Sequence, residues 1–160
     1  MLLRLSVEAD ADAIWTILEP VIRAGETYAF PVDWNRKEAM AYWHSPGHEV
    51  FVAEDAGAVV GTYYMRANQM GGGAHVANCG YVTRAGMTGR GTGCAMCLHS
   101  LERARERSFT AMQFNFVVAT NERAVALWTK LGFAIVGTLP AAFRHPRLGL
   151  VDAYVMYRAL

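Results

Sequence analysis

The sequence predicts one α/β domain over residues 1–160, with a mixed, mostly antiparallel central sheet flanked by helices. Three observations predict this class. Short β-branched and aromatic runs alternate with segments in which apolar residues recur every three or four positions. Asp55-Ala56-Gly57-Ala58 joins two such runs in the manner of a hairpin turn. No repeat, linker or block of charge divides the chain, and 53% apolar residues against 18% charged ones excludes disordered and low-complexity classes.

Local patterns indicate the elements of the first half of the chain. Asp10 is a suitable N-cap for a helix whose apolar stripe includes Ile14 and Ile17, and Pro20 loosens the end of that helix. Residues 25–34 combine Gly, Pro and aromatic residues without a regular period, which indicates a structured loop. The other elements expected here are a strand at 2–7, a short helix that stops at Ser45-Pro46-Gly47, and antiparallel strands at 50–54 and 59–65.

The second half alternates strands and helices. Apolar residues from Cys94 to Ala104 lie on one face of a predicted helix, and Gly132 is a suitable stop for a second one that opens at Asn121. We expect a tip at 71–73, a strand at 75–83, a helix at 93–107, a strand at 112–118, a helix at 121–132, and strands at 133–139 and 151–157, with a Pro- and Arg-bearing loop at 140–149.

Charge and cysteine content limit the partners and the compartment. A net charge of +1, with 13 arginines and 2 lysines, provides no uniform positive field for nucleic acid, so an anion site must be local. Arg4 and Glu8 interrupt the amino-terminal apolar run before a signal peptide or membrane span could form. Three cysteines without a disulfide-like spacing suit a reducing compartment, so a cytoplasmic location without membrane attachment is expected. No metal site is expected, because Cys94 and Cys97 lack a second cysteine pair.

A glycine cluster marks the expected site of chemistry. Eight of the 15 glycines lie within residues 71–93. A strand, a glycine-rich turn and a helix start can hold phosphates, because glycine lets backbone N–H groups approach the oxygens and the helix start is partially positive. The turn at 86–92 lacks the lysine of a Walker loop, and the run 91–96 lacks the third glycine of a dinucleotide fingerprint. Neither of these two phosphate motifs is therefore present.

Two separated motifs resemble the GNAT family of acyl-CoA-dependent N-acyltransferases. Gly89-Arg90-Gly91-Thr92-Gly93 is similar to the pyrophosphate loop of that family. About thirty residues later, the run from Asn121 to Phe133 is similar to its second signature, Asn-x-x-Ala-x-x-Leu-Tyr-x-Lys-x-Gly-Phe. The order of strands and helices matches over essentially the whole chain. The resemblance implies a sheet splayed between its fourth and fifth strands, with acetyl-CoA bound in the splay.

The resemblance also implies roles for particular residues. Backbone N–H groups near Val82 and Thr83 would stabilise the developing oxyanion, and Asn121 would bind the pantetheine arm or help to close the site. The chain departs from the family at two positions. Thr88 stands where Arg or Gln is usual, and Trp128 stands where many members have a Tyr that protonates the thiolate. An indole cannot act as that acid. The residues expected to bind the cofactor are Val82, Thr83, Gly89, Arg90, Gly91, Gly93, Cys94, Asn121 and Trp128.

Two amides in apolar strands are candidates for substrate contact. Asn78 and Asn115 would cost about 1–3 kcal/mol each if buried without partners, so each should have a defined hydrogen bond, either across the sheet or to a substrate carboxylate or carbonyl. Runs around residues 112–115, 139–145 and 152–157 resemble the branch of the family related to the yeast azetidine-2-carboxylate acetyltransferase. That branch implies a small amino or imino acid as acceptor.

The acceptor amine needs a route for its proton. With a pKa near 10.4, presenting the free base at pH 7 costs on the order of 4–5 kcal/mol. Glu26, His75 and Asp152 are the candidate bases, and a water relay competes equally with them. The chain is therefore expected to acetylate a small amine without a metal. The family resemblance also implies that a homodimer can form. A non-catalytic acyl-CoA sensor and an acetyltransferase of protein amino termini are the alternatives.

Overall fold

A seven-stranded sheet runs through the structure, a computed structural model that describes residues 1–87 and 89–160. Its strand order is β1-β2-β3-β4-β5-β7-β6, and every neighbouring pair is antiparallel except β4 and β5. This arrangement confirms the predicted fold class. The strands are β1 (Leu2–Leu5), β2 (Glu49–Asp55), β3 (Ala58–Ala67), β4 (Val76–Thr83), β5 (Ala111–Val118), β6 (Ala134–His145) and β7 (Gly149–Ala159).

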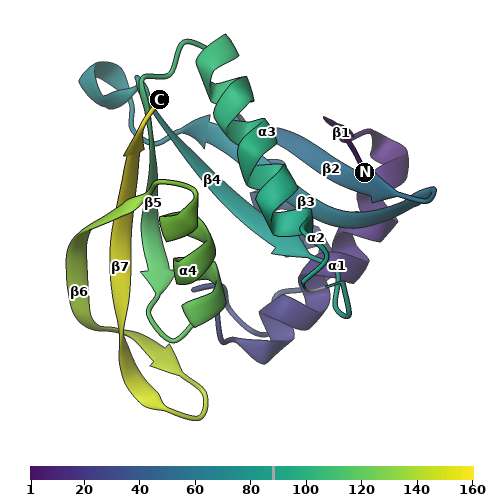
Figure 1. Cartoon of the computed structure of the whole chain (residues 1–160). Helices are drawn as coiled ribbons and strands as arrows, with labels where there is room; N and C mark the ends of the chain where they lie inside the picture. Colours follow the sequence, from purple (N-terminus) through teal and green to yellow (C-terminus); the bar gives the residue numbers. More distant parts are fainter. Residues whose placement is uncertain (88) are drawn as a thin grey trace.

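The described residues form four α-helices, which cover the two faces of the sheet (Figure 1). α1 (Ala11–Ala24) and α2 (Arg36–Trp43) lie on one face, and α3 (Thr92–Glu106) and α4 (Glu122–Lys130) lie on the other. Short 3-10 turns occur at Glu8–Asp10 and Gly71–Gly73. None of the helices in the described residues is long and apolar enough to cross a membrane.

Each face of the sheet has its own apolar core. On the α1 and α2 side, Ile14, Ile17 and Trp43 are at most 1% exposed. On the α3 and α4 side, Met96 and Met112 are fully buried. Because alternate residues of a strand point to opposite faces, β3 supplies Tyr64 to the first core and Tyr63 to the second.

α1 extends beyond the proline that was expected to loosen its end. The helix continues from Pro20 to Ala24, and it ends at Gly25, whose φ of +61° is the left-handed conformation that glycine favours. Ile22, 2% exposed, lies in the core beyond the proline. Burial of the Ile22 side chain explains why the helix persists despite the N–H group that Pro20 lacks.

The prediction of a loop at 140–149 is wrong. β6 and β7 pair as a long hairpin as far as His145 and Gly149, with a register shift between Leu139 and Phe143. Ala141 adopts a φ of +51° in this irregular stretch, and its N–H donates to Asp152 Oδ1 at 2.9 Å. Pro140 is tolerated because β6 is an edge strand and the bulge removes the need for its N–H.

Candidate active site

The central feature of the site is the point where β4 and β5 part. The two strands are in register at Val76 with Ala111 and at Ala77 with Met112, after which they diverge. At the two ends of β4, the Val76 carbonyl accepts from Asn68 and the Arg84 N–H donates to Val60. Alternate residues of β4 therefore bond to β3, and the backbone groups of Cys79, Tyr81 and Thr83 face the open side. Of the two expected oxyanion donors, Thr83 presents its backbone to the cleft, whereas Val82 bonds toward β3.

Two adjoining cavities occupy this splay. One, of about 370 Å³, lies toward α2 and the loop at 25–34; we call it the acceptor cavity. The other, of about 530 Å³, lies against the glycine-rich turn and the starts of α3 and α4; we call it the cofactor cavity. They share six lining residues, which are Thr27, Tyr28, Tyr81, Asn121, Ala124 and Trp128. The two cavities therefore meet at the parting of the strands.

Most of the residues expected to bind the cofactor line the cofactor cavity. Arg90 is exposed and does not line it, and Thr88 lies outside the described residues. Arg123, in the first turn of α4, lines it and adds a positive charge that sequence reasoning missed. The expected residues found around this cavity are Val82, Thr83, Gly89, Gly91, Gly93, Cys94, Asn121 and Trp128.

The glycine-rich turn is shaped by its backbone. Gly89 and Gly91 have φ values of +83° and +82°, and a Cβ at either position would meet nothing within 4 Å. Gly91 is the N-cap of α3. A Cβ at Gly93 would lie 3.3 Å from Leu127 Cδ2, so that glycine permits the close approach of α3 to α4. The first two therefore leave an open surface at a helix start, and the third serves packing.

The start of α3 also carries an unpaired polar atom. Thr92 is 1% exposed, and its Oγ1 has no hydrogen-bond partner among the described residues. The N–H groups of a first helical turn lack intrahelical partners as well. An anion at this helix start would therefore find donors already oriented toward the cofactor cavity.

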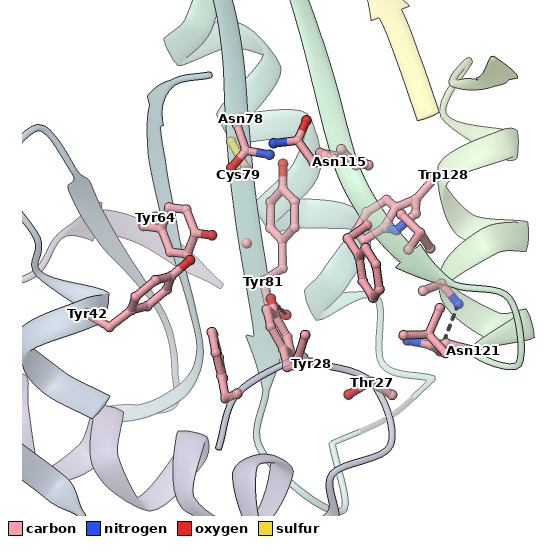
Figure 2. A pocket seen from close by; sticks show the side chains of 18 of the residues that line it. Thr27, Tyr28, Tyr42, Tyr64, Asn78, Cys79, Tyr81, Asn115, Asn121 and Trp128 are labelled. Atoms are coloured by element: carbon pink, nitrogen blue, oxygen red, sulfur yellow. Dashed lines mark hydrogen bonds between the residues drawn. The ribbon is translucent and has the colours of Figure 1, made fainter. Parts of the chain in front are cut away.

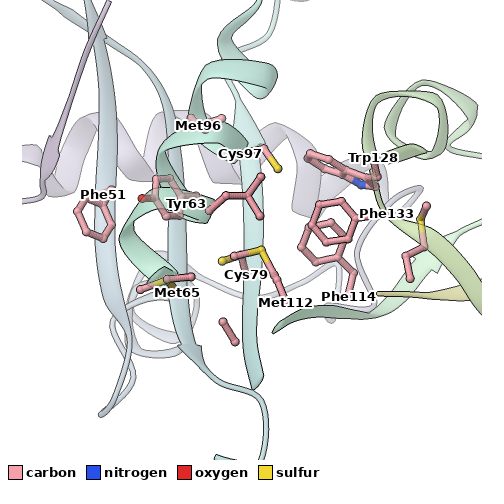
Figure 3. Packing of buried hydrophobic residues seen from close by; sticks show 14 of the residues in the cluster. Phe51, Tyr63, Met65, Cys79, Met96, Cys97, Met112, Phe114, Trp128 and Phe133 are labelled. Carbon is pink, nitrogen blue, oxygen red and sulfur yellow. The ribbon is translucent and has the colours of Figure 1, made fainter. Parts of the chain in front are cut away.

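Asn121 and Trp128 place α4 at the junction of the cavities. Asn121 caps α4, because its Oδ1 accepts from the Ala124 N–H at 3.4 Å (Figure 2). The centroid of the Trp128 ring lies 5.0 Å from that of Tyr81 and 5.1 Å from that of Phe114. Figure 3 shows Trp128 beside Phe114 in the core. The hydroxyl of Tyr81 is 2.7 Å from Ser100 Oγ, and burial raises the pKa of that phenol well above its ordinary value.

Aromatic rings form much of the wall of the acceptor cavity. Tyr42 and Tyr64 lie on one side of it and Trp128 on the other, with Tyr81 between them (Figure 2). A Cβ at Gly80 would lie 2.6 Å from Tyr64 Cε1, so glycine at that position lets the Tyr64 ring lie across β4. Tyr28, from the loop at 25–34, donates its hydroxyl hydrogen to the Tyr81 carbonyl at 3.0 Å. Burial raises the pKa of Tyr28 and of Tyr64, so both are neutral phenols at pH 7.

Both predicted amides line the acceptor cavity and lie side by side (Figure 2). Asn78 Nδ2 donates to the Gln113 carbonyl at 2.9 Å. Asn115 accepts from Gln113 Nε2 at 2.9 Å and donates to Asn68 Oδ1 at 2.6 Å. Each amide is therefore held by the protein while it faces the cavity.

The three candidate bases lie elsewhere. Glu26 forms an ion pair of 2.7 Å with Arg147 in the turn between β6 and β7. Asp152 accepts from Ala141, and His75 is exposed before β4. None of these residues lines either cavity, and the described residues around the acceptor cavity include no Asp, Glu or His.

Sequence reasoning also missed Arg66, which lines the acceptor cavity. In β3 it lies opposite Asn78 in the sheet register. The signal that could have revealed it is a charged residue within the otherwise apolar and aromatic run 59–67. Only the pairing of β3 with β4, however, places it beside the amides.

These features define a class: an α/β protein in which a glycine-rich helix start, suited to an anion, opens into a splayed sheet beside a second cavity. The structure is similar to that of a GCN5-related N-acetyltransferase from Kribbella flavida, at 40% identity and a TM-score of 0.94, covering 99% of this chain and 97% of that one. It shares its fold with yncA of Salmonella typhimurium, solved with acetyl-CoA bound, at 19% identity and a TM-score of 0.86, over 100% and 94% of the two chains.

The sequence comparisons agree with the structural ones. A curated relative, N-acetyltransferase aca1 of Schizosaccharomyces pombe, is 26% identical over 151 residues, which cover 84% of this chain and 72% of that protein. Residues 15–133 match the model of the acetyltransferase (GNAT) family. The chain belongs to the GNAT family, and it is an acetyl-CoA-dependent N-acetyltransferase.

Proposed function

We propose that residues 1–160 act as one domain that transfers acetyl from acetyl-CoA to the amine of a small amino or imino acid. The observation that carries this proposal is the pair of adjoining cavities at the splay, one beside a helix start suited to phosphate and one lined by amides and aromatic rings. The relation to aca1 and the resemblance to the azetidine-2-carboxylate acetyltransferase branch support the choice of acceptor.

The residues of the cofactor cavity fit acetyl-CoA. The orphaned Thr92 Oγ1, the open surface at Gly89 and Gly91, and the guanidinium of Arg123 provide donors and positive charge for its phosphates. Asn121 and Trp128 would flank the pantetheine arm where the cavities meet. When bound, acetyl-CoA would supply an activated thioester, and the backbone N–H of Thr83, on the open side of β4, would donate to the thioester carbonyl oxygen.

Water is the best-supported acceptor for the amine proton. A guanidinium such as that of Arg66 does not act as a base in proteins. Burial raises the pKa of the Tyr28 and Tyr64 phenols, so both phenols stay protonated and cannot accept the amine proton. The acceptor cavity is large enough to hold several ordered waters beside a small substrate. Asn78 and Asn115 would orient the acceptor while water carries its proton to solvent.

Two measurements test this function. Isothermal titration with acetyl-CoA should give saturable heat, and a ligand at about 100 times its Kd should stabilise the fold by about 2.7 kcal/mol, visible as a rise in Tm. Thiol release monitored over a panel of amino acids, imino acids and simple amines should then depend on the acceptor. Absence of both heat and thermal stabilisation would exclude acetyl-CoA as the ligand.

The same panel separates the two alternatives. Tight acetyl-CoA binding without thiol release for any acceptor would indicate a sensor, a reading that the indole at Trp128 favours. Release that requires a peptide amino terminus would indicate a protein acceptor. Asn115→Ala should raise KM or lower kcat for the small acceptor while acetyl-CoA affinity stays unchanged; loss of acetyl-CoA affinity alone would contradict the role assigned to Asn115.

Assembly and compartment complete the proposal. All three cysteines are free thiols, which supports a reducing compartment such as the cytoplasm. The β6–β7 hairpin exposes apolar side chains, which supports a homodimer formed through it; they include Val136, Leu139, Leu148 and Leu150. Sedimentation velocity at micromolar concentration should give a dimer mass, and a monomer would contradict this assembly.

A further inference from the structure

We propose that Arg66 binds the carboxylate of the acceptor and makes the enzyme select amino or imino acids over simple amines. This inference rests on the proposed function, because it assigns a specificity-determining residue to the acceptor cavity of that reaction. It concerns a residue that neither GNAT motif contains.

Among the residues that the structure describes, Arg66 has no counter-ion at the cavity wall. Its side chain lines the acceptor cavity, and its Nε is buried with no hydrogen-bond partner among the described residues. It takes part in none of the ion pairs that those residues form. By contrast, Arg4 and Arg103 are held by carboxylates at 2.7 and 2.8 Å. A buried donor left without an acceptor is costly, so this guanidinium is suited to a ligand that brings one.

No carboxylate from the described part of the chain lies beside Arg66 in the cavity wall. Within the described residues, the acceptor cavity has no Asp or Glu in its wall. Tyr64, two positions earlier in β3, stays a neutral phenol because burial raises its pKa. His48 stacks on Tyr64 with 4.3 Å between centroids, and its pKa is lowered by burial and, to a smaller extent, by the charge of Arg66. A bound anion at this position would therefore supply the negative charge that the cavity wall lacks.

A carboxylate is the anion that best fits both the cation and its neighbours. A guanidinium can hold a carboxylate through two parallel N–H···O bonds, which fixes the position of the ligand as well as its charge. Asn78 lies opposite Arg66 in register and faces the same cavity, so its amide is available beside the same group. The amine of the acceptor would then point toward Tyr28, Tyr81 and Trp128, which border the cofactor cavity.

The assignment can be tested with pairs of acceptors that differ only in the presence of the carboxylate. We would measure kcat/KM for proline against pyrrolidine, and for alanine against ethylamine, in the wild-type protein and in Arg66→Gln. A lost charge-assisted pair should lower kcat/KM for the two amino acids by roughly 30- to 100-fold and leave the two amines within about threefold. Amino acids and simple amines differ in the pKa of their amines. That difference cancels when the kcat/KM of one acceptor is compared between the wild-type protein and the variant.

Two control variants keep the result interpretable. Arg66→Lys preserves the charge without the planar fork, and it should restore part of the activity with amino acids. Arg144→Gln removes an exposed arginine that lines neither cavity, and it should leave all four acceptors unchanged. If Arg66→Gln lowers kcat/KM equally for acceptors with and without a carboxylate, the assignment is overturned while the proposed function stands.

A binding measurement covers the case in which no amine supports thiol release and the proposed function itself fails. Trp34 and Trp128 line the acceptor cavity, so the intrinsic fluorescence should respond to ligands there. Proline and N-acetylproline should bind the wild-type protein at least tenfold more tightly than they bind Arg66→Gln. Equal affinity for the two proteins would overturn the role of Arg66 independently of turnover.

Discussion

Trp128 is the residue at which this chain departs most clearly from the family resemblance. The ring is 8% exposed and borders both cavities, and the family resemblance implies that the thiolate would leave beside it. An indole provides packing there but no acid. Because a coenzyme A thiol titrates near 8.5, as cysteine does, expelling the thiolate at pH 7 costs only about 2 kcal/mol relative to the thiol. The chemistry can therefore proceed without an acid at this position.

We predict that Trp128→Tyr raises kcat by no more than about 30-fold at pH 7, the factor that 2 kcal/mol represents. The gain should disappear above pH 8.5, where the thiolate no longer needs protonation. Trp128→Phe should keep kcat within about tenfold, because it retains an aromatic ring against Phe114. The measurement is the pH profile of kcat, with Tm as a control for folding. A loss of more than a thousandfold in Trp128→Phe, at unchanged acetyl-CoA affinity, would show that the indole has a direct role.

At the scale of elements, the glycine-rich turn was predictable because its signal is local. Positive φ at Gly89 and Gly91 and the helix start at Thr92 follow from neighbouring residues. The β6–β7 hairpin was not, because Pro140 and the run of small and basic residues after it read as a loop. Its pairing depends on a bulge and on the hydrogen bond that the Ala141 N–H donates to Asp152, a residue eleven positions later in the chain.

Gly91→Ala tests the turn as a phosphate site. Ala at a φ of +82° should cost about 1–2 kcal/mol of stability. The added methyl group also projects onto the surface where the ligand approaches, so we expect acetyl-CoA affinity to fall by roughly tenfold or more. Gly86→Ala is the matched control: its φ is +79° and its Cβ meets nothing within 4 Å, but it does not line the cofactor cavity. Calorimetric titration should show weaker binding in Gly91→Ala alone; equal losses in both variants would assign the effect to backbone strain.

The junction of β1 and α1 carries a pH-dependent contribution to stability. Asp10 receives two bonds from Arg4, at 2.7 and 2.9 Å, and one from the Val7 N–H at 2.8 Å. In the folded state the pKa of this carboxyl is lowered, and the hydrogen bonds from Arg4 are the largest cause. Its stabilisation is therefore complete above the unfolded pKa of about 3.9 and is lost as the pH falls through the lower, folded value.

We predict that Asp10→Asn lowers the free energy of unfolding by about 1–3 kcal/mol at pH 7, since a charge-assisted network loses its charge. The deficit should shrink as the pH falls below about 3.9, because Asp10 then gains a proton in the unfolded wild-type chain before it does so in the folded one. Urea unfolding of both proteins between pH 7 and pH 3 measures it. Asp12→Asn is a control, because Asp12 is 89% exposed and its ion pair with Arg36 should contribute little. A deficit independent of pH would contradict the electrostatic account.

At the scale of the whole molecule, the acceptor cavity joins segments that are distant in sequence. Tyr28, Tyr42, Tyr64 and Asn115 come from a loop, a helix and two strands, and the sheet register determines that they meet. The sequence alone indicates the loop, from its glycine, proline and aromatic residues, and the two amides, from their apolar strands. Arg66 requires the pairing of β3 with β4. The candidate bases were chosen by residue type, and the tertiary structure places all three outside the cavity walls.

One long-range contact links the loop at 25–34 to the β6–β7 hairpin. The ion pair between Glu26 and Arg147 is 2.7 Å long, and Thr27 beside it lines both cavities. Arg147 is 74% exposed, so the pair should contribute less than about 1 kcal/mol to stability. Its expected role is to hold the loop that carries Tyr28 against the cavity.

Glu26→Gln and Arg147→Gln separate that role from catalysis by the Glu26 carboxylate. If the ion pair holds the loop, both variants should raise KM for the acceptor by the same two- to fivefold, with kcat and acetyl-CoA affinity unchanged. In 0.5 M salt the wild-type KM should approach theirs, because an exposed pair is screened over a few ångströms. If Glu26 is instead the base, Glu26→Gln alone should lower kcat by 100-fold or more and remove a limb of its pH profile. Steady-state kinetics of the two variants at low and high salt therefore distinguishes a positioning carboxylate from a proton acceptor.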